Sequence, residues 1–139
     1  MVKKLILFIL ANVLAFAANA LQEIPVASTQ RITTATSADM YARKTDVGII
    51  VTTNITAITG TQTITPIIEG KDARGNYYTL LSGTAGSATG VITMYVRPGI
   101  TAATNAAASL PLPPVFRVRA LHSGSAITAT YSISVDRTN

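Results

Sequence analysis

Few residues of this chain have both the type and the spacing that chemistry requires. His122 is the only histidine and there is no cysteine, so a hydrolase triad or a histidine-based metal site would lack partners. The carboxylates are scattered, and only Glu69 and Asp72 lie close together in sequence. The sequence therefore predicts a protein without catalytic residues, without a cofactor and without a strong metal site.

The loop at residues 70–76 holds the one arrangement that suggests a metal ligand set. Asp72 and Asn76 both offer oxygen atoms, which are the ligands that Ca²⁺ prefers. Asp and Asn are also common turn residues, because their side chains accept hydrogen bonds from nearby backbone N–H groups. We expect a hairpin loop here, with weak Ca²⁺ binding near Asp72 as the alternative.

The composition favours a β protein or a subunit packed into an assembly. Hydrophobic residues make up 48% of the chain and charged residues only 12%, about half the usual charged share. Thr, Ser, Asn and Gly must therefore cover much of the surface. The formal net charge of +5 is a small excess with no basic run behind it, so we expect no nucleic-acid partner.

The N-terminal segment, residues 1–21, is strongly apolar. Lys3 and Lys4 precede a hydrophobic run, and Ala18-Asn-Ala20 has the small-x-small form of a signal-peptidase site. A secretory signal peptide is one interpretation, and an apolar arm buried against partner subunits is another. A membrane anchor is the third, although a spanning helix needs about 20 apolar residues and this run is slightly shorter.

Residues 22–46 show no sustained period, apart from one possible short strand at 31–36. We expect an extended arm that becomes ordered against a partner. Its larger apolar and basic side chains, together with the last residue of the preceding segment, are the expected partner contacts: Leu21, Ile24, Arg31, Tyr41, Arg43 and Lys44.

From residue 47 onward, apolar and polar residues alternate with the period of half-buried strands. The strands expected on this basis cover residues 47–57, 62–69, 77–81, 91–96, 115–120 and 127–135. Pro66 cannot donate a ladder hydrogen bond, which places its strand at an edge or a bulge. The pattern predicts a single antiparallel β-sandwich over residues 47–139, jelly-roll or immunoglobulin-like, with about seven strands counting the weak one in the arm.

The last two strands are expected to form a hairpin that turns at residues 122–125. Arg117 and Arg119 share the face opposite Phe116, and a solvated face is the simplest interpretation of that pair. The inward faces of the strands predict the core residues Val51, Ile64, Leu80, Phe116, Val118, Tyr131 and Ile133.

Four segments of this sequence resemble a known family. They are residues 68–81 (IEGKDARGNYYTLL), 95–99 (YVRPG), 112–118 (LPPVFRV) and 127–133 (ITATYSI). In their order of strands and turns they resemble the small β-sandwich virion proteins of tailed bacteriophages, such as capsid decoration or cement proteins and head–tail accessory subunits. The resemblance covers roughly residues 47–135.

The resemblance implies a non-enzymatic structural subunit of the virion. Its partners would be the major capsid protein or other virion subunits, and it would form homo-oligomers. The alternative is an exported bacterial β-sandwich, a secreted or cell-surface protein or adhesin, whose N-terminal segment meets the membrane only transiently as a cleaved signal. A carbohydrate-active enzyme or lectin is disfavoured, since the chain has no tryptophan and no paired carboxylates.

Overall fold

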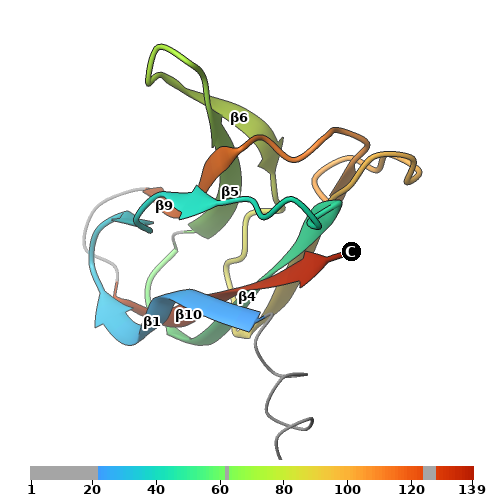
Figure 1. Ribbon diagram of the computed structural model, residues 1–139. Coiled ribbons are helices and arrows are strands. Elements are labelled where there is room, and N and C mark those ends of the chain that lie inside the picture. Colours follow the sequence, from blue (N-terminus) through green and yellow to red (C-terminus); the bar gives the residue numbers. More distant parts are fainter. Residues whose placement is uncertain (1–21, 62, 124–127) are drawn as a thin grey trace, which may run out of the picture.

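Ten strands make up the regular structure of the residues that the computed structural model describes, 22–61, 63–123 and 128–139. They stack as two layers (Figure 1). Sheet A has the order β1 (Gln22–Arg31), β10 (Ala129–Thr138), β4 (Gly48–Ile58), β7 (Gly90–Val96) and β8 (Ala107–Ala108). Sheet B has the order β2 (Ala35–Thr36), β9 (Val115–Ser123), β5 (Thr63–Lys71) and β6 (Tyr77–Ser82), and β3 (Met40–Tyr41) also pairs with β9.

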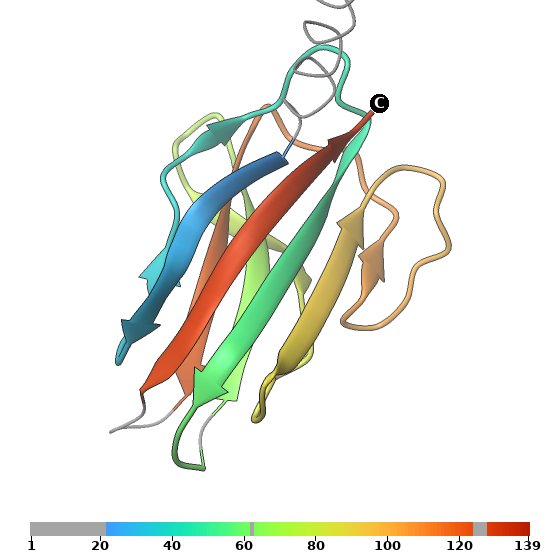
Figure 2. The same ribbon diagram turned by 90° about the horizontal axis from the view of Figure 1, so that it is seen from below.

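The predicted all-β sandwich is confirmed. All pairings are antiparallel except that of β7 with β8, which is parallel. Figure 2 shows the outer face of sheet A, with its strands side by side. Strand β10 alternates between buried and half-buried residues along its whole length. This is the alternation that the sequence displays, because one face of each sheet must cover the core.

The predicted core is also correct in nearly every position. Val51, Ile64, Phe116, Val118, Tyr131 and Ile133 are each exposed by 1% or less. Leu80 is only partly buried and packs against the edge of this cluster.

The predicted hairpin of the last two strands is wrong. Strand β9 pairs with β5 in sheet B, whereas β10 pairs with β4 and β1 in sheet A. The chain between them therefore crosses from one sheet to the other, and residues 124–127 lie outside the described part. Alternation shows which face of a strand is buried, but it does not identify the strand beside it.

Residues 22–46 are not an arm outside the sandwich. Strand β1 pairs with β10 from Gln22 to Arg31, and Val26 and Met40 belong to the core. The sequence concealed this strand because its register shifts twice, around Val26, which breaks the period of two. It is also an edge strand with mostly exposed side chains.

Strand β5 is an inner strand, so the edge position predicted from Pro66 is wrong; of the predicted alternative, a bulge, the structure shows a register shift between Ile68 and Glu69 in the pairing with β6. It pairs with β9 on one side and β6 on the other. The carbonyl of Pro66 accepts a hydrogen bond from Gly83 N at 2.8 Å, while the pairs with β6 end at Ile67 and Ser82. Pro66 therefore lies just beyond the last pair of the β5–β6 ladder, and its lack of an N–H donor coincides with the end of that ladder.

The hypotheses about the N-terminal apolar segment concern residues 1–21, which lie outside the described part of the chain. Of the residues that are described, none belongs to a helix long and apolar enough to cross a membrane.

Candidate partner-binding end of the sandwich

One end of the sandwich combines the start of β1 with the ends of its neighbours. Gln22 pairs with Asp136 of β10, which pairs with Ile50 of β4, which in turn pairs with Tyr95 of β7. Residues 1–21 therefore connect to the described chain at this end. Four of the expected partner contacts are found here.

A buried ion-pair network supports this end. The Arg137 side chain is only 3% exposed, and its guanidinium lies 2.7 Å from Asp46 Oδ2 and 2.8 Å from Glu23 Oε1. It also donates a hydrogen bond to the carbonyl of Tyr41 at 2.7 Å and lies 5.7 Å from the centre of the Phe116 ring. One side chain thus links β10, β1 and the segment that follows β3.

The network holds Asp46 in the charged form. Burial opposes ionisation of Asp46, but the backbone N–H of Arg43 at 2.8 Å and the Arg137 guanidinium outweigh it, so the pKa of Asp46 lies below its usual value. Burial likewise opposes the charge of Arg137, yet hydrogen bonds to Asp46 and Glu23 raise its pKa. Asp46 and Arg137 therefore form a permanent ion pair that stabilises this end of the sandwich, and they do not act as groups that exchange protons.

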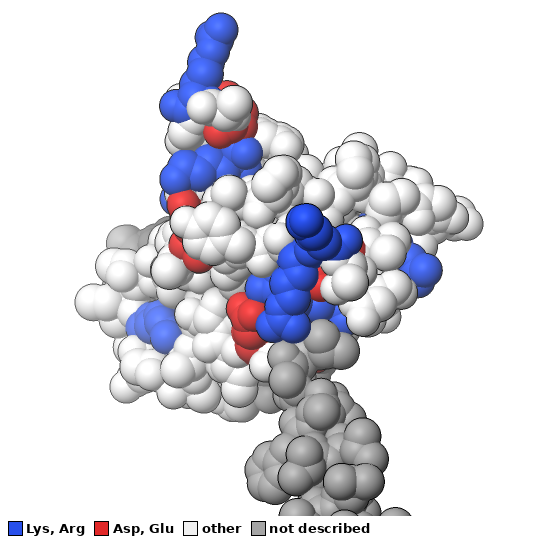
Figure 3. All heavy atoms as spheres, in the orientation of Figure 1, with Lys and Arg blue, Asp and Glu red and all other residues white. Residues whose placement is uncertain are grey.

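Exposed apolar and basic side chains surround this support. Ile24 is 61% exposed, Tyr41 67% and Val47 41%, and Arg43 and Lys44 are also exposed. Arg43 reaches Glu23 at 4.0 Å, and Val47 N donates to Thr138 O at 2.7 Å. We call the five residues Ile24, Tyr41, Arg43, Lys44 and Val47 the exit surface. Figure 3 shows basic and acidic atoms grouped where the grey residues join the described chain.

The predicted contact residues thus divide into two groups. The first group belongs to the exit surface and contains Ile24, Tyr41, Arg43 and Lys44. Val47 also belongs to this surface, but the sequence analysis did not name it as a contact because it is the first residue of an expected strand. Arg31 lies at the far end of β1, roughly 23 Å from Ile24 at about 3.3 Å per residue. Leu21 is outside the described residues.

Arg31 stabilises the fold through hydrogen bonds and does not belong to the exit surface. Its guanidinium donates to the carbonyls of Ala27 at 2.8 Å, Thr29 at 3.0 Å and Tyr131 at 3.1 Å. These atoms lie where the register between β1 and β10 shifts. The side chain therefore supplies donors to carbonyls beside this irregular part of the ladder.

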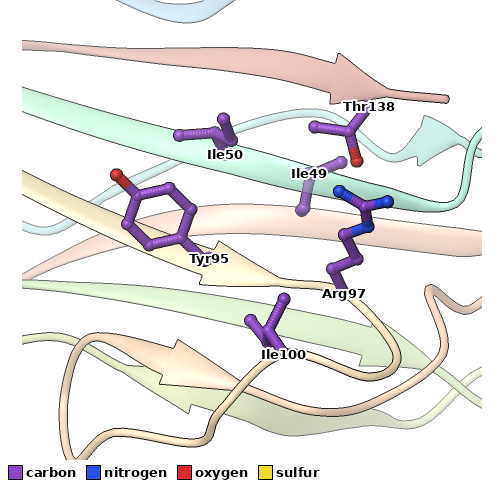
Figure 4. A pocket seen from close by; sticks show the side chains of 6 residues that line it. All are labelled: Ile49, Ile50, Tyr95, Arg97, Ile100 and Thr138. Carbon is purple, nitrogen blue, oxygen red and sulfur yellow. The ribbon is translucent and has the colours of Figure 1, made fainter.

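A shallow apolar hollow of about 180 Å³ lies on the outer face of sheet A at the same end (Figure 4). Ile50, Tyr95 and Ile100 line it, with Arg97 and Thr138 on its border. The sequence did not reveal this hollow, because Ile100 belongs to a loop whose path only the folded chain determines.

The outer face of sheet B carries a second charged cluster. Glu69 is 7% exposed at its side chain and lies 2.6 Å from Arg117 Nε and 3.2 Å from Arg119 Nη2. The Arg117 guanidinium stacks on the Tyr77 ring, 3.4 Å from its centre. Arg117 and Arg119 are therefore paired with a carboxylate, and the simple solvated face expected for them is wrong.

Asp39 completes this cluster from the segment between β2 and β3. It pairs with Lys71 at 2.7 Å and accepts a hydrogen bond from the Tyr77 hydroxyl. These two hydrogen bonds, that of Lys71 first, lower the pKa of Asp39. The whole cluster joins β9, β5 and β6 to the segment between β2 and β3, which is a structural role.

The other candidate residues also take structural positions. His122 lies in β9 rather than in a turn, and its Nε2 is 3.0 Å from the hydroxyl of Tyr131. Asp72 Oδ1 accepts hydrogen bonds from the backbone N–H groups of Arg74 and Asn76, at 2.9 and 2.8 Å. The predicted loop is thus a side-chain-stabilised turn, and within the described ranges no three His, Cys, Asp or Glu residues are grouped to hold a metal ion.

The sequence matches no protein-family model and no curated protein.

Proposed function

We propose that this protein is a non-enzymatic structural subunit of a phage virion, a decoration or cement protein that binds neighbouring capsid subunits through the exit surface. The exit surface carries this proposal. Its apolar and basic side chains are exposed, while Arg137 and Asp46 beneath them are buried and form an ion pair with each other. A rigid support of this kind lowers the entropy that binding would otherwise cost.

The binding energy would come from modest contacts repeated many times. Burial of apolar surface contributes about 25 cal/mol per Å², and Ile24, Tyr41 and Val47 supply exposed apolar surface. Arg43 and Lys44 would favour an acidic partner surface and accelerate association. On a capsid, multivalency raises the apparent affinity without any strong single site.

Variants of the exit surface test the proposal. Ile24→Ala combined with Tyr41→Ala should reduce binding to purified capsids roughly tenfold or more, as expected for central apolar contacts. Leu121→Ala is the matched control, because Leu121 is 38% exposed and lies six residues along β9 from Val115, the strand partner of Tyr41, and it should leave binding unchanged. Equal binding by both variants would refute the exit surface as the contact.

A second candidate function is that of an exported surface protein. Strand β1 begins at Gln22, two residues after the predicted cleavage site at Ala20, and every described strand follows it. Removal of residues 1–20 would therefore leave all ten strands in place. Mass spectrometry of the native N-terminus separates the candidates, because a chain beginning at Leu21 would favour export and a chain retaining residues 1–20 would favour the virion subunit.

A further inference from the structure

We propose that residues 27–36 form a strap that closes one end of the sandwich at neutral pH and opens when His122 becomes protonated. The strap comprises the end of β1, the connection from sheet A to sheet B, and β2. Figure 2 shows that β1 runs away from the end that holds the C-terminus, so the strap lies at the opposite end from the exit surface. Its opening is therefore separate from the contact proposed for capsids and does not depend on that function.

The strap buries little of its own length. Val26 before it and Ser37 after it are buried, with 4% and 8% exposure, and Ser37 N donates a hydrogen bond to the carbonyl of Val118 at 2.9 Å. Between these two fixed points no residue is buried, and only Arg31 and Ala35 are half-buried. Segments with few buried contacts open at a lower free energy than the core around them.

The contacts that hold the strap closed converge on Tyr131 and His122. The Arg31 guanidinium lies 5.0 Å from the centre of the Tyr131 ring and donates to the Tyr131 carbonyl at 3.1 Å. Thr34 Oγ1 accepts a hydrogen bond from His122 N at 3.2 Å, and the backbone N–H of Ala35 faces the Tyr131 hydroxyl. A change at this pair of rings therefore reaches the strap directly.

The hydrogen bond between the two rings requires a neutral imidazole. His122 Nε2 lies 3.0 Å from the hydroxyl of Tyr131, a fully buried residue. Because the Ala35 N–H faces the hydroxyl oxygen, we assign the hydroxyl hydrogen to Nε2, whose lone pair accepts it. Protonation turns Nε2 into a donor, which leaves the hydroxyl hydrogen without an acceptor, and a buried donor without a partner is costly.

The surroundings of the imidazole also oppose a positive charge. Arg31 faces it from the strap and already carries one. The Tyr131 phenol faces it from β10, and the fully buried Ile64 lies beside it on β5. The other ring nitrogen, Nδ1, is buried and has no hydrogen-bond partner among the described residues. A protonated ring would therefore be more stable where water could reach it.

None of the six carboxylates of the chain, all of which the structure describes, lies at this end. Glu69 pairs with Arg117, which is five residues along β9 from His122, roughly 16 Å at about 3.3 Å per residue. The others belong to the exit end, to the charged cluster on sheet B or to the loop after β5: Glu23, Asp46, Asp136, Asp39 and Asp72. The closed strap thus offers no counter-charge to a protonated His122.

The direction of the pH effect follows from these contacts. Burial and the Arg31 charge lower the pKa of His122 in the closed state, whereas an open strap lets the ring return toward its ordinary pKa of about 6.5. Protons therefore bind the open state more tightly and favour it at low pH. At pH 5.5 the open fraction should rise up to about tenfold over its value at pH 7.5, because one proton is involved.

Hydrogen exchange of the full chain tests the strap, because it reports local opening along the sequence. After correction for the intrinsic pH dependence of exchange, the protected amides of residues 28–36 should exchange up to about tenfold faster at pH 5.5 than at pH 7.5. The amide of Val47, which donates to Thr138 O at the exit end, should show no such change. His122→Gln should abolish the acceleration, whereas Leu121→Gln, at the adjacent outward position of β9, should retain it.

An NMR titration of the His122 ring in the wild type provides the second measurement, and it needs no variant because the chain has no other histidine. The pH at which the strap amides accelerate should coincide with protonation of this ring, and acceleration while the ring stays neutral would overturn the proposal. Equal corrected rates at both pH values, or acceleration that persists in His122→Gln, would also overturn it. Equal acceleration of every protected amide would do the same, because it would indicate global unfolding and not a local strap.

Discussion

Arg137 Nη1 lies 2.7 Å from Asp46 Oδ2, and the two side chains are 3% and 0% exposed. This ion pair connects β10, the last strand, to the segment that precedes β4, about ninety residues earlier in the sequence. Because water cannot replace either partner, each charge depends on the other, and the exit surface depends on both.

Arg137→Met should therefore destabilise the fold by about 3–5 kcal/mol, since it leaves a buried carboxylate without its partner. Chemical denaturation measures this free energy. Arg43→Met is the control, because its pair with Glu23 is long and half exposed and should contribute under about 1 kcal/mol. Adding Asp46→Asn to Arg137→Met should restore part of the loss; an unchanged deficit would indicate that packing, and not charge, is responsible.

The stability of the fold should fall as the pH drops below about 6.5 because of His122. Burial, assisted by the nearby Arg31 charge, lowers the pKa of His122 below its ordinary 6.5. The folded state thus favours the neutral ring, and its full contribution holds above pH 6.5 and is lost as the pH falls toward the lower folded pKa. His122→Gln should flatten this decline in the free energy of unfolding, and an identical pH slope in both proteins would contradict the assignment.

Removal of His122 should have no effect on function. The side chain bonds to Tyr131 inside the sandwich and, in our proposal, no chemistry depends on it. His122→Ala should bind capsids as well as the wild type at pH 7.5, with its folding checked by circular dichroism. A folded variant that loses binding or an activity would count against the non-enzymatic assignment.

Phe116→Ala should cost about 3–5 kcal/mol of stability, because the ring is fully buried and its loss leaves a cavity. Thr130→Ala changes an outward, half-buried position of β10 and should cost far less. Thermal or urea unfolding of both variants measures the difference. Comparable losses would mean that the strand faces are assigned the wrong way round.

Deletion of residues 1–45 should abolish the fold, whereas deletion of residues 1–21 should preserve it. The longer deletion removes β1, β2 and β3, and with them the core contacts of Val26 and Met40 and the Glu23 partner of Arg137. The shorter deletion leaves every described strand intact. Circular dichroism with thermal unfolding distinguishes the two, and a cooperatively folded 46–139 fragment would contradict the integrated role of β1.

The sequence by itself determined which residues are buried and what kind of structure they build. Alternation in residues 127–135 identified the inward face of β10, including Tyr131 and Ile133, because one face of a half-buried strand packs on the core and the other contacts water. Residues 22–46 show no such period, and Ile24, Tyr41, Arg43 and Lys44 became candidate contacts only as apolar and basic side chains of that segment. The sequence could not show that they share one end of the sandwich.

Only the tertiary structure decided which strands are neighbours and which charges meet. Strand β1 was hidden because its shifted register breaks the alternation, and its hydrogen bonds to β10 connect residues about a hundred positions apart. The Arg137 network joins Glu23 and Asp46 across similar separations, and the hollow beside Tyr95 needs a loop to close it. Periodicity is a local property of the chain, whereas pairing, ion pairs and hollows depend on contacts between distant segments, which form only when the sandwich closes.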